Sequence, residues 1–397
     1  MSLPTGSGLR VAMVAGEPSG DQLAGHLIEA IRARVPDAVF FGIGGPKMAA
    51  CGFDVWTPMD ELSVFGYVDA LKNYHRISAI RRATRARLLA DPPDVFIGVD
   101  APDFNLDLEW ELKTRGVHSI HYVSPSIWAW RRGRLKKIVR SVDHLLCLFP
   151  FEPALYQGHG LDVSYVGHPL ADTIPPKLNR LLIREKLSID PASKVVALLP
   201  GSRNSELKRL AEPMLRTAAI MAEQQPGIQF LVPLATRETR MFFENTLYQL
   251  GLVGLPIRLM FGHAQDALGA ADVALVASGT ATLEAALMKC PMVITYKIGG
   301  LQHWLLKKLA YLPYVGLPNV LAGRFLVPEL LQDEATPEAL AAALLDLLAD
   351  AGRRAAMIDG FNEIHQALRQ DNANKAASAI LTSMGRPLET AGEPALV

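Results

Sequence analysis

The chain has 397 residues, half of them apolar, which is long enough for two domains with packed cores. Lys and Arg together number 40, as do Asp and Glu, and this balance argues against a general attraction to nucleic acid. Three cysteines without metal-ligand spacing favour reduced thiols and a cytosolic protein. We expect no signal peptide and no membrane-spanning segment, because no stretch approaches about 20 uninterrupted apolar residues.

The first half of the chain alternates strands with helices, as in a parallel α/β sheet. The expected strands are residues 10–15, 39–43, 94–99, 118–123, 143–149 and 163–166. The loop after the first strand lacks the G-x-G-x-x-G spacing, which disfavours a dehydrogenase. In this loop Glu17 or Ser19 could face a ligand, whereas Asp21 suits a structural place near a helix start.

Asp100 directly follows the apolar strand at 94–99. Open parallel sheets bind their ligands at the carboxyl ends of the strands. A carboxylate placed there can take a proton from a substrate hydroxyl. The alternative, a turn or helix-cap aspartate, suits Asp103 better than Asp100.

The segments 61–74 and 297–319 are apolar or aromatic, and both are open between core packing and a surface for acyl chains or a bilayer. A basic helix is expected at 77–90, either as a solvated face or as a contact with anionic lipid. The segment 124–137 holds Trp128 and Trp130 beside Arg and Lys, which suits a membrane interface or a phosphate pocket. The neutral net charge argues against nucleic acid as its partner.

A Pro-rich linker at 174–176 separates two domains, which we expect at residues 1–173 and 174–385. The pattern then restarts, with strands expected at 194–199, 228–232, 257–260, 273–277 and 292–295. The Ala- and Leu-rich helices near the end are expected to complete the second domain and to pack back on the junction.

In the second domain, the strand at 273–277 leads through Ser278, Gly279 and Thr280 into a helix. Such a turn directs backbone N–H groups, hydroxyls and the positive end of the helix dipole at one place, which suits a diphosphate. Glu284 lies one helical turn after Thr280 and could reach the hydroxyls of a ribose. An ordinary capped turn is the alternative.

Two further residues could join this site. Arg203, at the apex of the turn that follows the strand at 194–199, can bind diphosphate oxygens with its planar fork of donors. Asn319 is a candidate polar contact at the edge of the second domain.

Seven blocks of the sequence resemble the lipid-A-disaccharide synthases, glycosyltransferases of the GT-B type. They are residues 15–21, 98–105, 122–130, 167–169, 199–203, 278–284 and 317–319, and they cover most of the chain in order. The Glu-Pro-Ser-Gly-Asp and Ser-Pro-Ser-Ile-Trp-Ala-Trp blocks are the most specific. Arg203 and the Ser-Gly-Thr turn are shared widely among GT-B nucleotide-sugar enzymes.

The resemblance implies two Rossmann-like domains, with the acceptor on the first, the donor on the second and the active site in the cleft between them. The implied reaction joins UDP-2,3-diacylglucosamine to 2,3-diacylglucosamine 1-phosphate (lipid X) with inversion, and it gives a β-1,6-linked disaccharide 1-phosphate and UDP. No cofactor and no metal are implied. A Gram-negative source and peripheral association with the cytoplasmic face of the inner membrane follow from the acylated substrates.

The resemblance also suggests residue roles. Asp100 would be the base, and Arg203 with the turn at 278–280 would stabilise the leaving UDP. Glu284 would hold the ribose and Asn319 would contact the donor. The residues expected on the acceptor and lipid side are Glu17, Ser19, Trp128 and Trp130.

Other functions are compatible with the same architecture. A UDP-sugar 2-epimerase or a transferase acting on a polyprenyl-linked sugar is disfavoured by the Trp-rich block. A non-catalytic peripheral membrane protein that binds lipid or nucleotide would leave Asp100, Arg203 and Glu284 without a task. The sequence leaves open the acyl-chain length, the oligomeric state (a homo-oligomer included) and the patch that contacts lipid.

Overall fold

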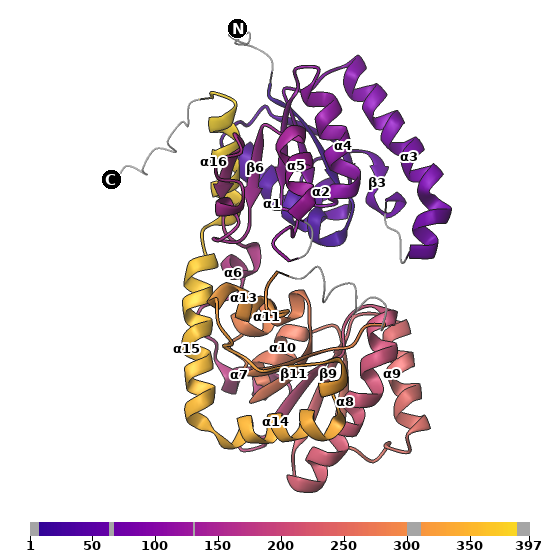
Figure 1. Ribbon diagram of the computed structural model, residues 1–397, viewed down its shortest axis with the longest axis vertical. Coiled ribbons are helices and arrows are strands. Elements are labelled where there is room, and N and C mark those ends of the chain that lie inside the picture. Colours follow the sequence, from indigo (N-terminus) through magenta and orange to yellow (C-terminus); the bar gives the residue numbers. More distant parts are fainter. Residues whose placement is uncertain (1–7, 63–66, 130–131, 300–310, 387–397) are drawn as a thin grey trace. The chain divides into compact units, whose positions relative to one another are not determined.

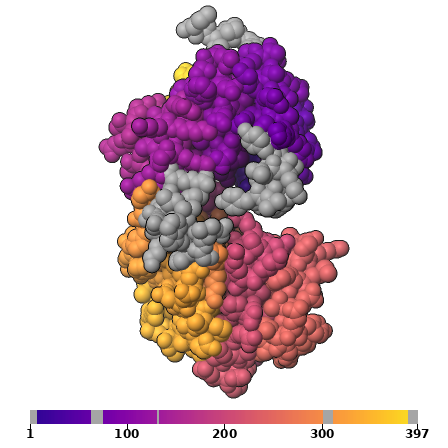
Figure 2. Space-filling view, turned by 45° about the vertical axis from the view of Figure 1, so that its right-hand side comes forward, coloured from indigo at the N-terminus to yellow at the C-terminus, as the bar shows by residue number. Residues whose placement is uncertain are grey.

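The computed structural model describes residues 8–62, 67–129, 132–299 and 311–386. The chain divides into two units, each described here by itself. Unit 1 consists of Met1–Asp172 and Leu368–Val397, and unit 2 of Thr173–Ala367. The yellow end of the chain accordingly lies among the indigo and magenta atoms of unit 1 (Figure 2).

Unit 1 is built on a parallel sheet in the order β3-β2-β1-β4-β5-β6-β7. Its strands are β1 (Arg10–Ala15), β2 (Val39–Gly44), β3 (Asp54–Pro58), β4 (Val95–Val99), β5 (His118–Tyr122), β6 (His144–Cys147) and β7 (Asp162–Tyr165). β1 and β4 are apolar and almost wholly buried, as expected of strands covered on both faces.

Helices cover both faces of this sheet. They are α1 (Pro18–Arg32), α2 (Pro46–Ala50), α3 (Tyr67–Ala90), α4 (Pro102–Lys113), α5 (Leu135–Ser141), α6 (Pro169–Thr173) and α16 (Asn372–Ser383), with 3₁₀ turns at η1 (Met59–Glu61), η2 (Arg132–Arg134) and η3 (Pro153–Leu155). Alternate residues of β1 point to opposite faces. Val11 and Met13 join the core that includes α1 and α16, whereas Ala12 and Val14 join the core under α3 and α4.

The chain returns to unit 1 at its end. The Leu368 carbonyl accepts a hydrogen bond from the His168 backbone N–H at 2.9 Å, and the Asp172 carboxylate accepts the Asn372 N–H at 2.7 Å. Helix α16 then packs against α1 (Figure 1), with Ile380 fully buried. The sequence analysis placed residues 174–385 in the second domain. In the structure, α16 belongs to unit 1, because its apolar face completes the core of that unit.

Unit 2 carries a second parallel sheet, in the order β10-β9-β8-β11-β12-β13. Its strands are β8 (Val195–Leu199), β9 (Gln229–Leu234), β10 (Ile257–Phe261), β11 (Val273–Ala277), β12 (Met292–Tyr296) and β13 (Glu329–Leu331). Its helices are α7 (Arg180–Lys186), α8 (Asn204–Gln224), α9 (Arg237–Gln249), α10 (Ala264–Ala270), α11 (Thr280–Leu287), α13 (Leu317–Ala322), α14 (Pro337–Ala349) and α15 (Ala351–Leu368), with a 3₁₀ turn η4 (Gln332–Glu334). The predicted α/β class with two parallel sheets is confirmed.

Each sheet reverses its strand order once. In unit 1 the reversal lies between β1 and β4, and in unit 2 between β8 and β11. The loops at the carboxyl ends of such a strand pair diverge, and ligands of open α/β sheets bind between them. The two reversals therefore show where the candidate site residues should be sought.

No helix among the described residues is long and apolar enough to cross a membrane. The apolar residues 64–65, and the side chains of residues 67–74, on which a lipid-facing surface was predicted, lie outside what the structure describes, as do residues 300–310.

Candidate active site

Asp100 lies at the strand reversal of unit 1, directly after β4. Its backbone N–H continues the sheet by donating to the Tyr122 carbonyl at 2.8 Å. Asp100 and Ala101 then adopt left-handed backbone angles, with φ of 52° and 44°. Because residues other than glycine rarely adopt this conformation, the surrounding contacts must hold the turn in place.

The predicted residues of the first loop lie beside this turn. A side-chain carbon placed on Gly16 would lie 3.4 Å from the Ala101 Cβ, so the loops after β1 and β4 are in contact. Glu17 and Ser19 are exposed at the start of α1. The structure thus brings Glu17 and Ser19 to the same end of the sheet as Asp100.

Asp21 has the structural role that its position suggested. Its buried carboxylate accepts hydrogen bonds from three backbone N–H groups, those of Gly45, Lys47 and Met48, at 2.9–3.0 Å. Asp21 thereby anchors the first turn of α2 to α1 and is unavailable to a substrate.

An aromatic row follows the carboxyl ends of β5, β6 and β7. Trp128 packs edge-on against Phe151 at 5.5 Å, Phe151 stacks on Phe149 at 5.8 Å, and Phe149 stacks on His168 at 5.7 Å. Trp128 is half-buried, and Trp130 lies outside the described residues. Burial lowers the pKa of His168 to about 4, so this imidazole is neutral at physiological pH.

The predicted diphosphate turn lies at the strand reversal of unit 2. Gly279 has a φ of 150° and a ψ of −162°, a conformation available essentially to glycine alone. No side chain caps the helix that begins at Thr280, and both Gly279 and Thr280 are exposed. The first backbone N–H groups of α11 therefore face solvent with the positive end of the helix dipole.

Ser278 is fixed from two sides rather than left open. Its backbone N–H donates to the Thr295 carbonyl at 2.9 Å, and its hydroxyl donates to the Val315 carbonyl at 3.2 Å. Glu284 lies one turn into α11 and accepts a hydrogen bond from Gln265 at 3.1 Å. Sequence reasoning missed Gln265, since α10 had no motif to single it out.

Arg203 precedes α8 in the loop after β8, the strand that pairs with β11. The Glu206 carboxylate accepts the Arg203 backbone N–H at 3.4 Å and lies 3.9 Å from the guanidinium, and the Arg203 side chain is 76% exposed. Gly201 is required here, because a side-chain carbon would lie 2.4 Å from the Glu206 carboxylate. The structure therefore brings Arg203 and the Ser278–Thr280 turn to the same end of two adjacent strands.

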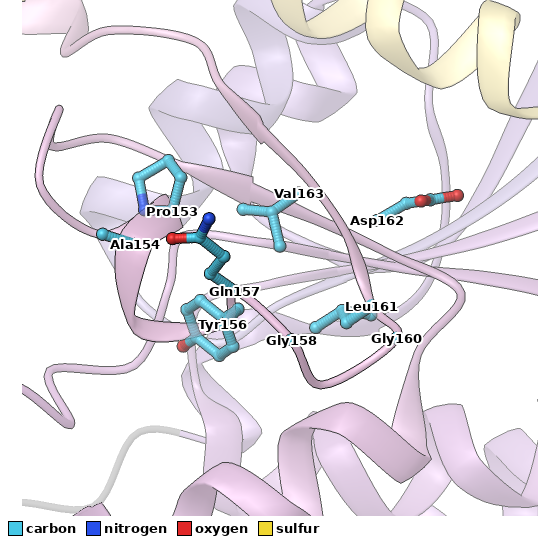
Figure 3. A pocket seen from close by; sticks show the side chains of 9 residues that line it. All are labelled: Pro153, Ala154, Tyr156, Gln157, Gly158, Gly160, Leu161, Asp162 and Val163. Carbon is cyan, nitrogen blue, oxygen red and sulfur yellow. The ribbon is translucent and has the colours of Figure 1, made fainter.

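Pockets also occur away from these residues. A pocket of ≈ 450 Å³ is lined by residues 153–163 of unit 1, at the amino end of β7 (Figure 3). Gln157 and Tyr156 line it, and the Asp162 carboxylate points away from them (Figure 3). It contains none of the predicted site residues, and among the described residues no cluster of three His, Cys, Asp or Glu side chains could hold a metal ion.

Comparison with known proteins identifies the family. Residues 11–382 match the family model described as lipid-A-disaccharide synthetase. The lipid-A-disaccharide synthase of Dechloromonas aromatica is 61% identical over 377 residues, which are 95% of this chain and 99% of that protein. The chain belongs to the lipid-A-disaccharide synthase family.

Two solved structures share the fold. A UDP-GlcNAc 2-epimerase from Neisseria meningitidis bound to UDP-GlcNAc is 11% identical, with a TM-score of 0.61 over 95% of this chain and 99% of that chain. A glycosyltransferase involved in lipopolysaccharide biosynthesis is 14% identical, with a TM-score of 0.56 over 94% of this chain and 99% of that chain. At these identities the likeness shows the fold alone.

The predicted family, its GT-B fold and its enzyme class are thus confirmed. The individual residue roles and the placement of the active site between the domains stay predictions. The proposed donor contact at Asn319, however, meets a physical obstacle in the structure of this synthase.

Asn319 is fully buried in α13, and its amide is already used. Its nitrogen donates to the Val327 carbonyl at 2.9 Å and to the Glu329 carboxylate at 2.8 Å. Its oxygen accepts the backbone N–H groups of Leu326 and Val327. Because both donors and both acceptor positions are occupied, Asn319 supports the loop around it, and its amide has no position left for a further hydrogen bond in this structure.

Asn319→Ala should therefore lower the stability of unit 2. The Val327 N–H and the Val327 carbonyl both lose their partner, at about 1–3 kcal/mol each, so we expect a loss of roughly 2–6 kcal/mol in the free energy of unfolding. Urea denaturation followed by circular dichroism measures this change. Asn245→Ala on the exposed face of α9 is the matched control, and its stability should change by less than about 0.5 kcal/mol. Equal stability of the two variants would contradict the buried role of Asn319.

Proposed function

We propose that this protein catalyses the reaction for which its family is named. UDP-2,3-diacylglucosamine is the donor, 2,3-diacylglucosamine 1-phosphate is the acceptor, and the products are the β-1,6-linked disaccharide 1-phosphate and UDP. One observation supports this best: the candidate residues lie at the strand reversals of the two sheets. Asp100 lies at the reversal in unit 1, and Arg203 lies with the Ser278–Thr280 turn at the reversal in unit 2.

The bond changes assign a task to each of these groups. The acceptor 6-oxygen forms a bond to the anomeric carbon of the donor, on the face opposite to the UDP oxygen, whose bond breaks. A single displacement therefore converts an α-linked donor into a β-linked product. The 6-hydroxyl loses its proton in this step, and Asp100 is the residue that takes it.

Negative charge develops on the β-phosphate as UDP leaves. The exposed guanidinium of Arg203 and the uncapped N–H groups at the start of α11 offer donors that fit this charge. Glu284, held by Gln265, lies one turn along the same helix and accepts hydrogen bonds from the ribose hydroxyls.

Asp100→Asn should lower turnover by roughly 10²–10⁴-fold, because the amide cannot accept the proton, while UDP affinity stays unchanged. The assay supplies both acylated sugars without added metal and follows the disaccharide by mass spectrometry and UDP by a coupled reaction. Asp103→Asn is the control, since Asp103 lies in the first turn of α4 with its side chain 77% exposed. Near-normal turnover of Asp100→Asn would remove Asp100 as the base.

Arg203→Ala should weaken UDP binding by roughly tenfold or more, because a charge-assisted hydrogen bond contributes about 1.5–3 kcal/mol. Isothermal titration with UDP measures the change directly. Arg216→Ala removes another exposed arginine of α8, one paired with Glu212 at 2.9 Å, and should leave the titration unchanged. Equal UDP affinities for Arg203→Ala and the wild type would place the diphosphate elsewhere.

The membrane surface is the proposed partner for both acylated substrates. Three of the large exposed apolar side chains, Tyr311, Val315 and Phe325, flank α13, with exposed fractions of 46%, 45% and 63%. Phe325 packs edge-on against Tyr314 at 4.8 Å, and the Val315 carbonyl accepts the Ser278 hydroxyl. The apolar side chains thus adjoin the proposed donor turn and could contact the acyl region of a bilayer.

The double variant Val315→Ser, Phe325→Ser should bind vesicles of anionic phospholipid several-fold more weakly than the wild type, since it removes apolar area from this surface. Co-sedimentation measures the bound fraction. The control is Tyr248→Ser on α9, which removes a side chain that is 70% exposed in the same unit. Unchanged binding of the double variant, or an equal loss in Tyr248→Ser, would exclude this patch as the lipid contact.

A further inference from the structure

Three polar side chains are fully buried behind the Asp100 turn: Asn105 and Glu109 on α4, and His121 on β5. The Glu109 carboxylate and the His121 imidazole are joined by a hydrogen bond of 2.7 Å between Oε1 and Nδ1. Asn105 and Glu109 are four residues apart, so they lie on the same face of α4. The sequence analysis assigned no role to these three residues, although Asn105 ends the block at 98–105 that carries the family resemblance.

This cluster lies directly against the strand that carries Asp100. Gly98 pairs with His121 across the sheet, two residues before Asp100. A side-chain carbon on Gly98 would lie 2.1 Å from the Glu109 carboxylate and 2.9 Å from the Asn105 Cβ. Glycine at position 98 therefore lets the carboxylate approach the backbone of β4.

Asn105 connects the cluster to the turn itself. Its amide nitrogen donates to the Asp100 carbonyl at 2.8 Å and to the Val14 carbonyl at 3.3 Å. Val14 belongs to β1 and Asp100 follows β4, so a single side chain spans the strand reversal. The left-handed turn at Asp100 is held by Asn105 on its carbonyl and by Tyr122 on its N–H.

The cluster is costly as a purely structural feature. Within the described part of the chain, Asn105 Oδ1, Glu109 Oε2 and His121 Nε2 are buried without a hydrogen-bond partner. Each such atom lowers the stability of the fold, and a buried charged pair is often no more stable than an apolar replacement. Polar groups retained at this cost beside a candidate catalytic residue point to a functional role.

The charges around the pair are complementary. Burial alone lowers the pKa of His121, but the charge and hydrogen bond of Glu109 and the charge of Asp100 raise this pKa above its ordinary value. Burial also raises the pKa of Glu109, which Lys137 on α5 opposes together with His121. His121 therefore interacts electrostatically with both Glu109 and Asp100.

We propose that Asn105, Glu109 and His121 are positioning residues for Asp100: Asn105 fixes its left-handed turn, and the Glu109–His121 pair, packed against Gly98, fixes the end of β4 that carries it. This inference rests on the proposed role of Asp100 as the base. None of the three residues touches a substrate; they act through Asp100 alone. The cluster explains why a strained aspartate can be held at the end of β4 without a glycine.

His121→Gln tests the pair, because the amide can still hydrogen-bond to Glu109 but carries no charge. We expect kcat to fall about 10- to 100-fold, the range found for side chains that orient a functional ligand, with both KM values and the UDP affinity unchanged. Glu109→Gln, which also removes the counter-charge, provides a second variant of native size.

His144→Gln is the matched control. His144 is a buried histidine on the neighbouring strand β6, but it pairs with the Ser164 hydroxyl at 2.9 Å rather than with a carboxylate. It should lower the melting temperature without lowering kcat. If His121→Gln and Glu109→Gln both keep the wild-type kcat, the inference is wrong while an inactive Asp100→Asn still supports the base. If Asp100→Asn is active, the base assignment fails and this inference fails with it.

Discussion

Both sheets reverse their strand order beside the first strand of the unit. In unit 1, β1 pairs with β4 rather than only with its neighbour in sequence, and in unit 2, β8 likewise pairs with β11. This reversal is the constraint on which both candidate sites depend. Right-handed crossovers send the helices of the two halves to opposite faces of the sheet. The loops after the two central strands are therefore left without a covering helix, and chemically useful residues can be presented there.

A shared backbone device terminates the central strands. The residue after β4, β5 and β11 donates its N–H to the carbonyl of the neighbouring strand: Asp100 to Tyr122, Val123 to Leu146, and Ser278 to Thr295. The chain then turns through a positive φ, at Asp100 and Val123 themselves and at Gly279 after Ser278. Such angles cost of order 1–3 kcal/mol for residues other than glycine. The ladder hydrogen bond fixes the last peptide of the strand and so confines the strain to the residues that face a ligand.

The central strands could be predicted from the sequence because they are apolar runs buried on both faces, and β1 and β11 have the predicted bounds. The edge strands β3 and β13 were missed, since their half-buried residues form no apolar run. Helices α1 and α4 begin at Pro18 and Pro102, which the sequence reading had placed in loops. Proline suits the first helical position because its missing N–H has no partner there.

For the candidate site, too, the features that depend on local sequence could be predicted, and those that depend on long-range packing could not. The turn at Ser278 and the place of Asp100 follow from a strand and the residues just after it. The burial of Asn319 and the return of α16 depend on contacts across the chain, such as the hydrogen bond from the Asn372 N–H to Asp172. The hydrophobic periodicity of a single segment carries no information about such contacts. The sequence alone therefore could not distinguish a polar motif residue that contacts a ligand from one that supports the fold.

The supports behind the two loops differ in a way that fits their tasks. Behind the donor turn, the Glu329 carboxylate accepts the N–H groups of Val315 and Gly316 as well as the Asn319 amide, at 2.8–3.0 Å. That network is satisfied and therefore rigid, which suits a seat whose backbone donors must not move when a polyanion binds. Behind Asp100 the network joins Glu109 to His121 and, among the described residues, leaves Asn105 Oδ1, Glu109 Oε2 and His121 Nε2 without a hydrogen-bond partner. The two supports therefore differ: the one behind Ser278 is fully hydrogen-bonded, whereas the one behind Asp100 retains polar atoms that its own contacts do not satisfy.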